Sequence, residues 1–325
     1  MKKLSLLFAF ALALCLLIVG VAPVQASEGN QDPPLLIEDI DAEELEALDK
    51  LDLVPIDTPG QKVSITGGFK GVWVTENTVT DEIPGKVAGI YGIVNYDDGT
   101  SYGFFGGTWK NASGKMAGYL KGRYEGGQFR GIWRCLETGM WGPVIGRYTP
   151  DPTATADAMC YLFVGKWATL DGQLKGYLKG TWAPLALVKP EGRFSGQWMY
   201  NNQLTAASIQ PDGKLAGKYG AAVFSDGTKI HFFGGIWNSR DSDKGRLGGL
   251  IVDGRFCSLW NSDSSYSRGY LKGVWENNQF KGIWKQFGQD IEGRLWGVYR
   301  PLITITAVEK EPLPARQAVL ASVTR

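Results

Sequence analysis

One five-residue motif, apolar-x-Gly-x-Trp/Tyr, recurs along most of the chain and constrains the fold more than any other feature. Its first residue alternates without a break between Phe and Leu or Val, and ten of the twelve Trp residues close a copy. Complete copies start at Phe69, Val87, Phe105, Leu120, Phe129, Val144, Phe163, Leu178, Phe194, Leu215, Phe233, Leu271, Phe280 and Leu295. Weaker copies start at Leu247 and Phe256, and sixteen copies in all mark a repeat architecture.

The copies are organised in two halves of eight. Tyr91–Trp109 matches Tyr219–Trp237 without a gap, 128 positions later. Phe163–Trp182 matches Phe280–Tyr299 in the same way, 117 positions later. The chain is therefore a tandem duplication, and each half should fold in the same way.

The motif has the period of a β-strand, in which alternate residues share a face. One face of each strand should be buried and carry Phe or Leu, then Gly, then Trp or Tyr. The other face carries residues such as Lys70, Lys121 and Lys281, which we expect to be solvated. The central Gly leaves room for an aromatic ring from a neighbouring strand. Links as short as residues 125–128 and 276–279 require antiparallel hairpins.

These features predict an all-β fold, an antiparallel up-and-down meander of about 16 strands. Eight strands suffice to close a small barrel without an open edge, so the duplication favours two eight-stranded barrels. One continuous sheet is the alternative. A sixteen-stranded outer-membrane barrel is disfavoured, because its Phe/Gly/Trp face would have to meet lipid.

The domain boundaries follow from changes in composition. Residues 1–26 have the pattern of a secretory signal peptide cleaved after Ala26, which predicts a secreted or cell-envelope protein; an uncleaved anchor is the alternative. The expected segments are an acidic flexible leader (27–60), a first domain (61–183), a linker (184–191), a second domain (192–300) and a C-terminal tail (301–325). Glu38–Leu53 could form a short amphipathic helix within the leader.

Charge is unevenly distributed between the leader and the rest of the chain. Glu28–Asp57 has 11 acidic residues and one basic residue, whereas the chain from Thr58 has a net charge of +9 (31 basic minus 22 acidic residues). A basic body can attract an anionic partner. We favour the simpler interpretation that the leader neutralises the body or that both are solvated. Nucleic acid is not expected as a partner of an exported chain, nor is a membrane span after signal removal.

Two families contain similar short motifs. Val164–Trp167 and Leu120–Tyr124 resemble the strands of the avidin family, and this resemblance implies eight-stranded barrels. Avidins hold biotin with polar residues that have no identifiable counterparts here, so no ligand is transferred. Phe104–Trp109, preceded by Asp98-Gly99-Thr100, is similar to MORN repeats, and that resemblance implies an open sheet used as a protein scaffold.

Aromatic residues on the outward face are the main candidates for ligand binding. They are Tyr119, Trp141, Tyr177, Tyr270 and Trp296. Exposed aromatic rings beside Lys can stack on sugars or form a protein interface. The alternative, which we favour, is that they cover the contact between the barrels or support loops. His231, the only His, is a further candidate and should lie near a hairpin end on the Phe/Trp side.

Signals of catalysis or of a cofactor were not found in the sequence. No Gly-x-Ser-x-Gly motif accompanies His231, and the acidic loop Asp241–Gly245 lacks the third acidic ligand and closing Glu of a calcium loop. Strand parity places Cys135 with the Trp face, and Cys160 and Cys257 on the opposite face. We therefore expect neither a catalytic residue, nor a metal, nor a cofactor.

The sequence thus predicts a secreted, non-catalytic β-repeat protein that binds a ligand or acts at the cell surface. Its partner would be a carbohydrate or another envelope protein, bound by outer aromatics or at a barrel mouth. The alternatives are a structural scaffold of MORN-like hairpins and, less favoured, an extracellular hydrolase.

Overall fold

The computed structural model describes residue 37 and residues 40–76, 84–150, 161–201, 210–224 and 227–302. The expected signal peptide, Cys160 and nearly all of the C-terminal tail lie outside these residues. The described part has one helix, α2 (Ala42–Asp49), and fifteen strands. The strands are β1 (Gln61–Thr75), β2 (Gly85–Tyr96), β3 (Ser101–Lys110), β4 (Met116–Glu125), β5 (Gln128–Cys135), β6 (Trp141–Pro150), β7 (Tyr161–Ala168), β8 (Lys175–Tyr200), β9 (Gly213–Phe224), β10 (Lys229–Ser239), β11 (Lys244–Val252), β12 (Arg255–Ser262), β13 (Arg268–Glu276), β14 (Gln279–Gln286) and β15 (Glu292–Pro301).

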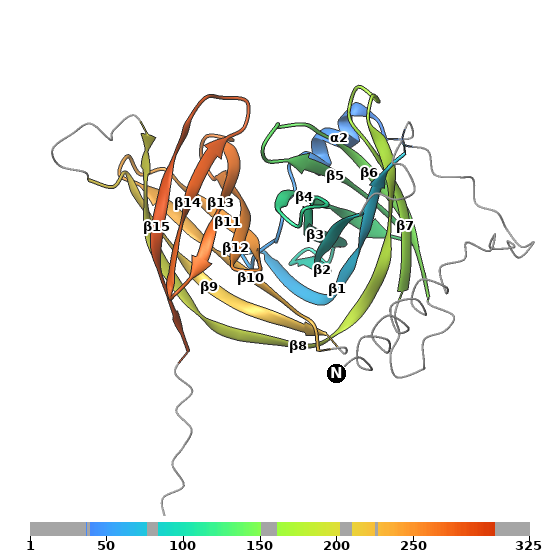
Figure 1. The fold of residues 1–325 in the computed structure, drawn as a ribbon. Helices are drawn as coiled ribbons and strands as arrows, with labels where there is room; N and C mark the ends of the chain where they lie inside the picture. Colours follow the sequence, from blue (N-terminus) through green and yellow to red (C-terminus); the bar gives the residue numbers. More distant parts are fainter. Residues whose placement is uncertain are drawn as a thin grey trace, which may run out of the picture. The chain divides into compact units, whose positions relative to one another are not determined.

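The strands form two closed rings that share one strand (Figure 1). Each strand from β1 to β8 pairs antiparallel with the next, and β1 pairs with residues 176–184 of β8 to close the first barrel. Strands β9 to β15 continue in the same way, and both β9 and β15 pair with the second half of β8. This confirms the predicted all-β, up-and-down fold and its division into two units of eight.

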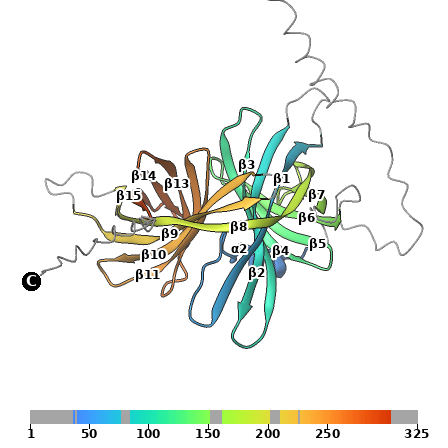
Figure 2. The ribbon, with the colours of Figure 1, turned by 90° about the horizontal axis from the view of Figure 1, so that it is seen from below.

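Sixteen motif copies occupy fifteen strands because β8 carries two of them. The 26-residue β8 contains the copies that start at Leu178 and Phe194, one in each barrel. Residues 184–191, expected to be a linker, lie inside β8 and carry it from one ring to the other (Figure 2). Register shifts between Leu185 and Leu187 and between Pro190 and Gly192 mark bulges, and Pro190 lies beside the second, where a missing ladder donor is tolerated. Pro184 pairs with Gly67 at the end of the β1–β8 ladder.

The inward face of each barrel has the predicted composition. In the first barrel, Phe69, Phe105, Phe129 and Phe163 form a closed ring of edge-to-face pairs, with centroids 5.9–6.2 Å apart and planes at 81–90°. The second barrel repeats this ring with Phe194, Phe233, Phe256 and Phe280. These contacts join alternate strands, as in layered small barrels.

A layer of glycines lies beside each Phe ring and explains why the motif requires Gly. A Cβ added to Gly122 would lie 2.1 Å from the carbonyl oxygen of Arg130 and 2.7 Å from the Phe105 ring. In the second barrel, Gly273 has the same surroundings, at 2.1 Å from the oxygen of Lys281 and 2.7 Å from Phe256. The Phe rings therefore fill the space that the glycines leave open.

One Trp closes the Phe end of each barrel. Trp182 is 4% exposed and stacks on Tyr148 with centroids 5.3 Å apart and planes at 11°. Trp275 takes the same place in the second barrel and stacks on Tyr299 at 4.8 Å and 17°. Both indoles also contact all four Phe of their own barrel. Each barrel is thus filled at this end, so that any cavity must lie at the other.

The acidic leader, expected to be flexible, is packed into the molecule over its described residues. Helix α2 contacts β4 and β5, and Leu48 is 4% exposed. Leu53 and Val54 are also buried, in a cluster that holds residues of both barrels. The expectation of a mobile leader is therefore wrong for residues 40–57. Enough apolar surface is buried here to fix the segment in place.

Charged groups from both barrels hold this leader. The carboxylate of Asp49 accepts hydrogen bonds from Arg134 of the first barrel at 3.4 Å and from Arg268 of the second at 2.5 Å. Lys121 donates to the carbonyl oxygens of Asp49, at 2.7 Å, and Leu51. Lys121 is 1% exposed, so its expected solvation is not observed. Its charge sits under the leader, and burial lowers its pKa to about 7.

Candidate binding site at the mouth of the second barrel

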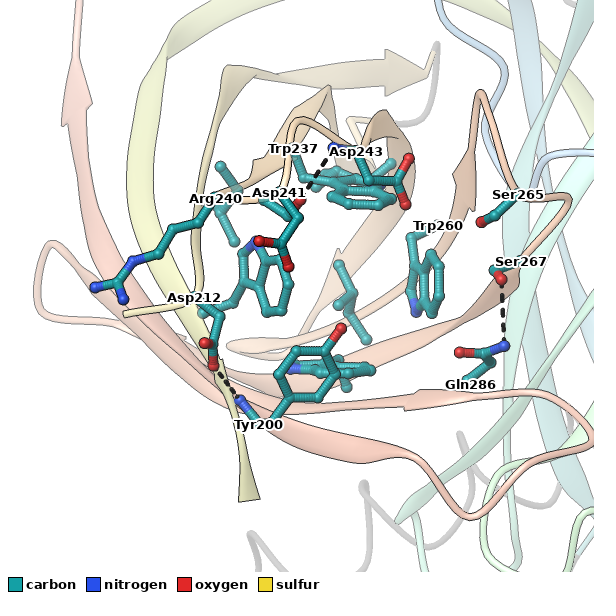
Figure 3. Close-up of a pocket in the computed structure, with 16 residues that line it drawn as sticks. Tyr200, Asp212, Trp237, Arg240, Asp241, Asp243, Trp260, Ser265, Ser267 and Gln286 are labelled. Atoms are coloured by element: carbon teal, nitrogen blue, oxygen red, sulfur yellow. Dashed lines mark hydrogen bonds between the residues drawn. The ribbon is translucent and has the colours of Figure 1, made fainter. Parts of the chain in front are cut away.

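The open end of the second barrel contains a cavity of about 580 Å³ (Figure 3). Its lining comes from the inward faces of the barrel strands and from the loops at their ends. The lining residues are Trp198, Tyr200, Asp212, Leu215, Trp237, Ser239, Arg240, Asp241, Asp243, Leu247, Trp260, Ser265, Ser267, Leu271, Trp284 and Gln286. Its volume is in the range of small-molecule sites.

Four Trp side chains form the floor of this cavity. Trp198, Trp237, Trp260 and Trp284 make a closed ring in which adjacent indoles are 5.5–6.0 Å apart and nearly perpendicular, at 85–88°. They close the copies on β8, β10, β12 and β14. These alternate strands of an antiparallel barrel run in the same direction, so the fifth residue of each copy lies at the same end.

Hydrogen bonds to the barrel wall orient the indoles. Nε1 of Trp198 donates to the carbonyl oxygen of Asn238 at 3.2 Å, and Nε1 of Trp237 to that of Asn261 at 3.1 Å. Nε1 of Trp284 donates to the carbonyl oxygen of Met199 at 3.1 Å. These three N–H groups are occupied by the backbone, so the floor offers a ligand chiefly aromatic surface.

Three carboxylates line the rim: Asp212 and Asp241 lie on one side, and Asp243 lies between Asp241 and Ser265 (Figure 3). Asp212 is 9% exposed and accepts a hydrogen bond from the Tyr200 backbone N–H at 2.8 Å. Asp243 accepts hydrogen bonds from the hydroxyls of Ser262 and Ser264 and from the Lys244 N–H. Burial alone would raise the pKa of Asp243, but these hydrogen bonds outweigh it and lower that pKa.

The negative charge of the rim acts on Tyr200, whose side chain lies in the cavity (Figure 3). Burial raises the pKa of this phenol, and the charges of Asp212, Asp241 and Asp243 raise it further. The three carboxylates therefore act together on one place at the mouth. Arg240 also lines the cavity, but its guanidinium donates to Gln210 at 2.7 Å and points away from the centre of the view in Figure 3.

The opposite side of the rim is polar and uncharged. It is formed by Ser265, Ser267 and Gln286, and Gln286 Nε2 donates to the Ser267 hydroxyl at 3.3 Å. The site thus combines an aromatic floor, an acidic side and a hydrogen-bonding side. Such a combination can hold a small molecule with an apolar body and define its orientation.

The mouth of the first barrel has the same floor but a different rim. Trp73, Trp109, Trp133 and Trp167 form an equivalent ring, with indoles 5.3–6.2 Å apart at 77–83°. The cavity above them is only about 170 Å³, and its lining includes Cys135, Met140 and Leu174. This end is therefore narrower and largely apolar.

None of the six residues proposed from the sequence lines the cavity of the second barrel. Tyr119 is 0% exposed and Tyr270 8%, and both lie in the cluster between the barrels. Trp141 is half-buried under the Arg134 guanidinium, which lies 5.1 Å from the ring. These three therefore belong to structural contacts, which was the alternative interpretation of the outward aromatics.

The other three are partly accessible but separate. Tyr177 is 46% exposed and donates to Glu76 at 3.2 Å. Trp296 is half-buried on the outside of the second barrel, beside Lys281 and Arg294. His231 Nε2 lies 3.4 Å from a Glu191 carboxylate oxygen. The structure does not bring these residues together into one site.

Two further sequence features can be placed. Cys135 and Cys257 are buried free thiols, with Cys135 at the mouth of the first barrel and Cys257 between the barrels, as parity predicted. Burial raises the pKa of Cys257 to about 12. Within the described residues, no group of three or more His, Cys, Asp or Glu is placed to hold a metal ion. That part of the chain also contains no helix long and apolar enough to cross a membrane.

The site that sequence reasoning missed had a visible signal. The loop Asp241–Gly245 is more acidic than its counterpart in the first half, Lys110–Gly114, although both follow a Trp that closes a copy. The floor residue Trp237 lies near the end of its strand, so the charged loop that follows this strand must lie at the mouth. This difference between the halves marks where the two barrels diverge.

Fold and cavity together define the class of protein: paired eight-stranded antiparallel barrels joined through a shared strand, one with an open, aromatic-floored mouth. No family model and no curated protein matches the chain. A solved structure similar in part is that of a Bacteroides fragilis protein described as a candidate outer membrane protein. It is 12% identical, the match covers 73% of this chain and 97% of that chain, and the TM-score is 0.22. We infer nothing about function from a likeness this weak.

Proposed function

We propose that this is an exported, non-catalytic binding protein that holds a small, partly apolar molecule in the mouth of the second barrel. One observation carries the proposal: a cavity of about 580 Å³ remains open above four ordered Trp side chains. Trp237 and Trp260 are partly exposed at this floor, whereas Trp198 and Trp284 are buried. A ligand that covers the accessible aromatic surface gains free energy, because such surface is costly in water. Export is proposed from the signal-peptide pattern of residues 1–26.

The contrast with the other end of the barrel supports binding over a purely structural role. At the Phe end, Trp275 fills the interior and contacts all four Phe rings. At the Trp end, none of the described residues forms such a plug, and polar residues line the opening instead. If the barrel served only as a scaffold, nothing would favour leaving this end open.

A binding role also fits the rim better than a catalytic one. Asp212 and Asp243 are tied down as hydrogen-bond acceptors, and the lowered pKa of Asp243 makes it a weak general base at neutral pH. Groups held in this way position and discriminate ligands. We therefore place recognition, not bond breaking, at this mouth.

The test is a ligand screen with matched variants. Ligand-observed NMR of a library of small amphipathic molecules should yield binders whose affinity falls at least about tenfold in Trp237→Phe, because the indole forms part of the floor. The control is Trp109→Phe, the equivalent position 128 residues earlier in the first barrel. Binders weakened equally by both variants, or by neither, would contradict the proposal.

A further inference from the structure

We infer that the molecule held in the second barrel is a compact organic cation, such as a quaternary or primary ammonium group attached to an apolar body. This inference rests on the proposed function and specifies its ligand class. It comes from the joint placement of the aromatic floor and the carboxylates. Both features attract positive charge, and both face the same cavity.

The floor favours a cation over a flat neutral ring. Indole has the strongest cation–π attraction of the natural side chains, and an ammonium group within about 6 Å of a ring centroid gains from it. Adjacent indoles here are perpendicular, at 85–88°. They therefore form no continuous flat platform, on which a sugar ring stacks best. This geometry favours a rounded group over the carbohydrate expected from the sequence.

The rim supplies a net negative charge. Three carboxylates line the cavity against one guanidinium, that of Arg240, which is engaged with Gln210. Burial raises the pKa of Tyr200, and Asp212, Asp241 and Asp243 each raise that pKa further, as expected for three charges near one group at the mouth. Asp241 is exposed and makes no hydrogen bond in the described part of the chain, so its charge can meet a ligand directly.

The polar side defines the rest of the ligand. Ser265, Ser267 and Gln286 lie across the cavity from Asp212 and Asp241 (Figure 3). A cation bound on the acidic side would therefore extend an apolar body over the Trp floor and place a hydroxyl or carbonyl group near these residues. Such a ligand satisfies both sides of the rim at once.

The first barrel provides the internal comparison. It has the same four-Trp floor, but none of the described residues that line its cavity carries a carboxylate. A cation that needed only indole rings would bind both mouths. Among the described residues, cation–π attraction and charge pairing are combined at the second mouth, so binding should be specific to that mouth.

The experiment compares choline with 3,3-dimethylbutan-1-ol, a neutral molecule of nearly the same shape. Titration calorimetry of the full chain at low salt should show choline binding at least about tenfold more tightly. Asp241→Lys should weaken choline at least about tenfold and leave the alcohol unchanged, because it reverses an exposed charge without touching the barrel. Raising the salt concentration should weaken choline only. Asp97→Asn, an exposed turn carboxylate of the first barrel, is the control and should change neither.

The outcomes separate this inference from the proposed function. Equal affinity for choline and the alcohol, or choline binding that survives Asp241→Lys, would overturn the cation inference. Failure of choline to bind would also overturn it, and the binding role would then stand only if neutral molecules from the screen lost affinity in Trp237→Phe. If no molecule responded to Trp237→Phe, both proposals would fail together.

Discussion

The two barrels are built from the same motif and differ in what surrounds their open ends. In both, four Phe and four Trp from alternate strands form closed rings, and one Trp fills the Phe end. The second mouth is wide and acidic, whereas the first is narrow and apolar. The common barrel structure, which we call the frame, is thus determined by the inward residues that recur in every copy. The two mouths differ through their loops, which the repeat does not constrain.

The shared frame predicts that both barrels should fail in the same way when their glycine layer is disturbed. Gly122→Val and Gly273→Val each place side-chain atoms within 2.1 Å of a carbonyl oxygen, where the backbone cannot yield cheaply. We expect each variant to lose at least about 3 kcal/mol of stability, or not to fold. Urea unfolding followed by circular dichroism measures this loss.

The control for the glycine variants is Lys281→Val on the exposed outer face of the second barrel, which should stay within about 0.5 kcal/mol of the parent protein. A large difference between the two glycine variants would break the equivalence of the barrels. Equal losses for Lys281→Val and Gly273→Val would mean that the assigned faces are reversed.

Much of this frame could be predicted from the sequence because it depends on local alternation. The motif fixed the number of copies, the inward face and the division into eight and eight. The shared strand β8 could not be foreseen, since Pro184 and Pro190 suggest a break and only the paired register shows the bulges that absorb one of them. A composition change alone does not distinguish a linker from a strand that serves two sheets.

The packing of the leader against the barrels was also not predicted, although the outward-facing residues of the strands contain a signal of it. Most copies carry a larger side chain at their second residue, but Gly occurs at 106, 234 and 248. A Cβ at Gly106 would meet the oxygen of Leu53 at 1.7 Å, and one at Gly248 that of Val54 at 2.1 Å. Gly106 and Gly248 thus admit the leader backbone between the barrels, and Gly234 admits the Ile56 side chain, which a Cβ would meet at 2.3 Å. Their role depends on a contact distant in sequence, so period and propensity could not reveal it.

The leader offers the next comparison, because Asp49 joins the two barrels. Its carboxylate is 8% exposed and pairs with Arg134 of the first barrel and Arg268 of the second. Asp49→Asn should destabilise the protein by about 3 kcal/mol, since it leaves two partly buried guanidinium groups without their counter-charge. Thermal unfolding monitored by calorimetry is the measurement.

A matched control for Asp49 is Glu46→Gln, one turn earlier in α2, whose ion pair with Lys50 is exposed on both sides. Exposed helix pairs contribute about 0.3–0.5 kcal/mol, so this variant should change little. If Asp49→Asn were equally mild, the leader would not be a structural bridge. A split of the melting transition into two steps would show that Asp49 couples the barrels.

The two barrels also differ at the position of Lys121. The residue at the equivalent position of the second half is Gly248. Burial lowers the pKa of Lys121 from 10.5 to about 7. Between about pH 7 and 10.5 the Lys121 side chain is protonated in the unfolded chain and neutral in the folded chain. The free energy of unfolding should therefore rise with pH above 7. Below pH 7 the cost of the buried charge is fully present.

The measurement is the difference in unfolding free energy between the parent protein and Lys121→Met, followed by urea titration from pH 7.5 to 9. The parent should gain about 1–2 kcal/mol relative to the variant over this interval, since each pH unit contributes at most about 1.4 kcal/mol. Other titrations cancel in the difference because the variant retains them. A flat difference would mean that Lys121 keeps an ordinary pKa under the leader.

The smallest expected effect compares two indoles at equivalent places in the Trp rings. Trp133 and Trp260 close the fifth copy of their halves. Nε1 of Trp133 donates to the Ala168 carbonyl oxygen at 2.9 Å, whereas Nε1 of Trp260 is buried and has no hydrogen-bond partner among the described residues. Replacement by Phe removes a satisfied N–H in the first case and an unsatisfied one in the second. Trp133→Phe should therefore cost about 1 kcal/mol more stability than Trp260→Phe, as measured by chemical unfolding. Equal costs would show that the second ring is hydrogen-bonded throughout like the first, and that the barrels differ only at their rims.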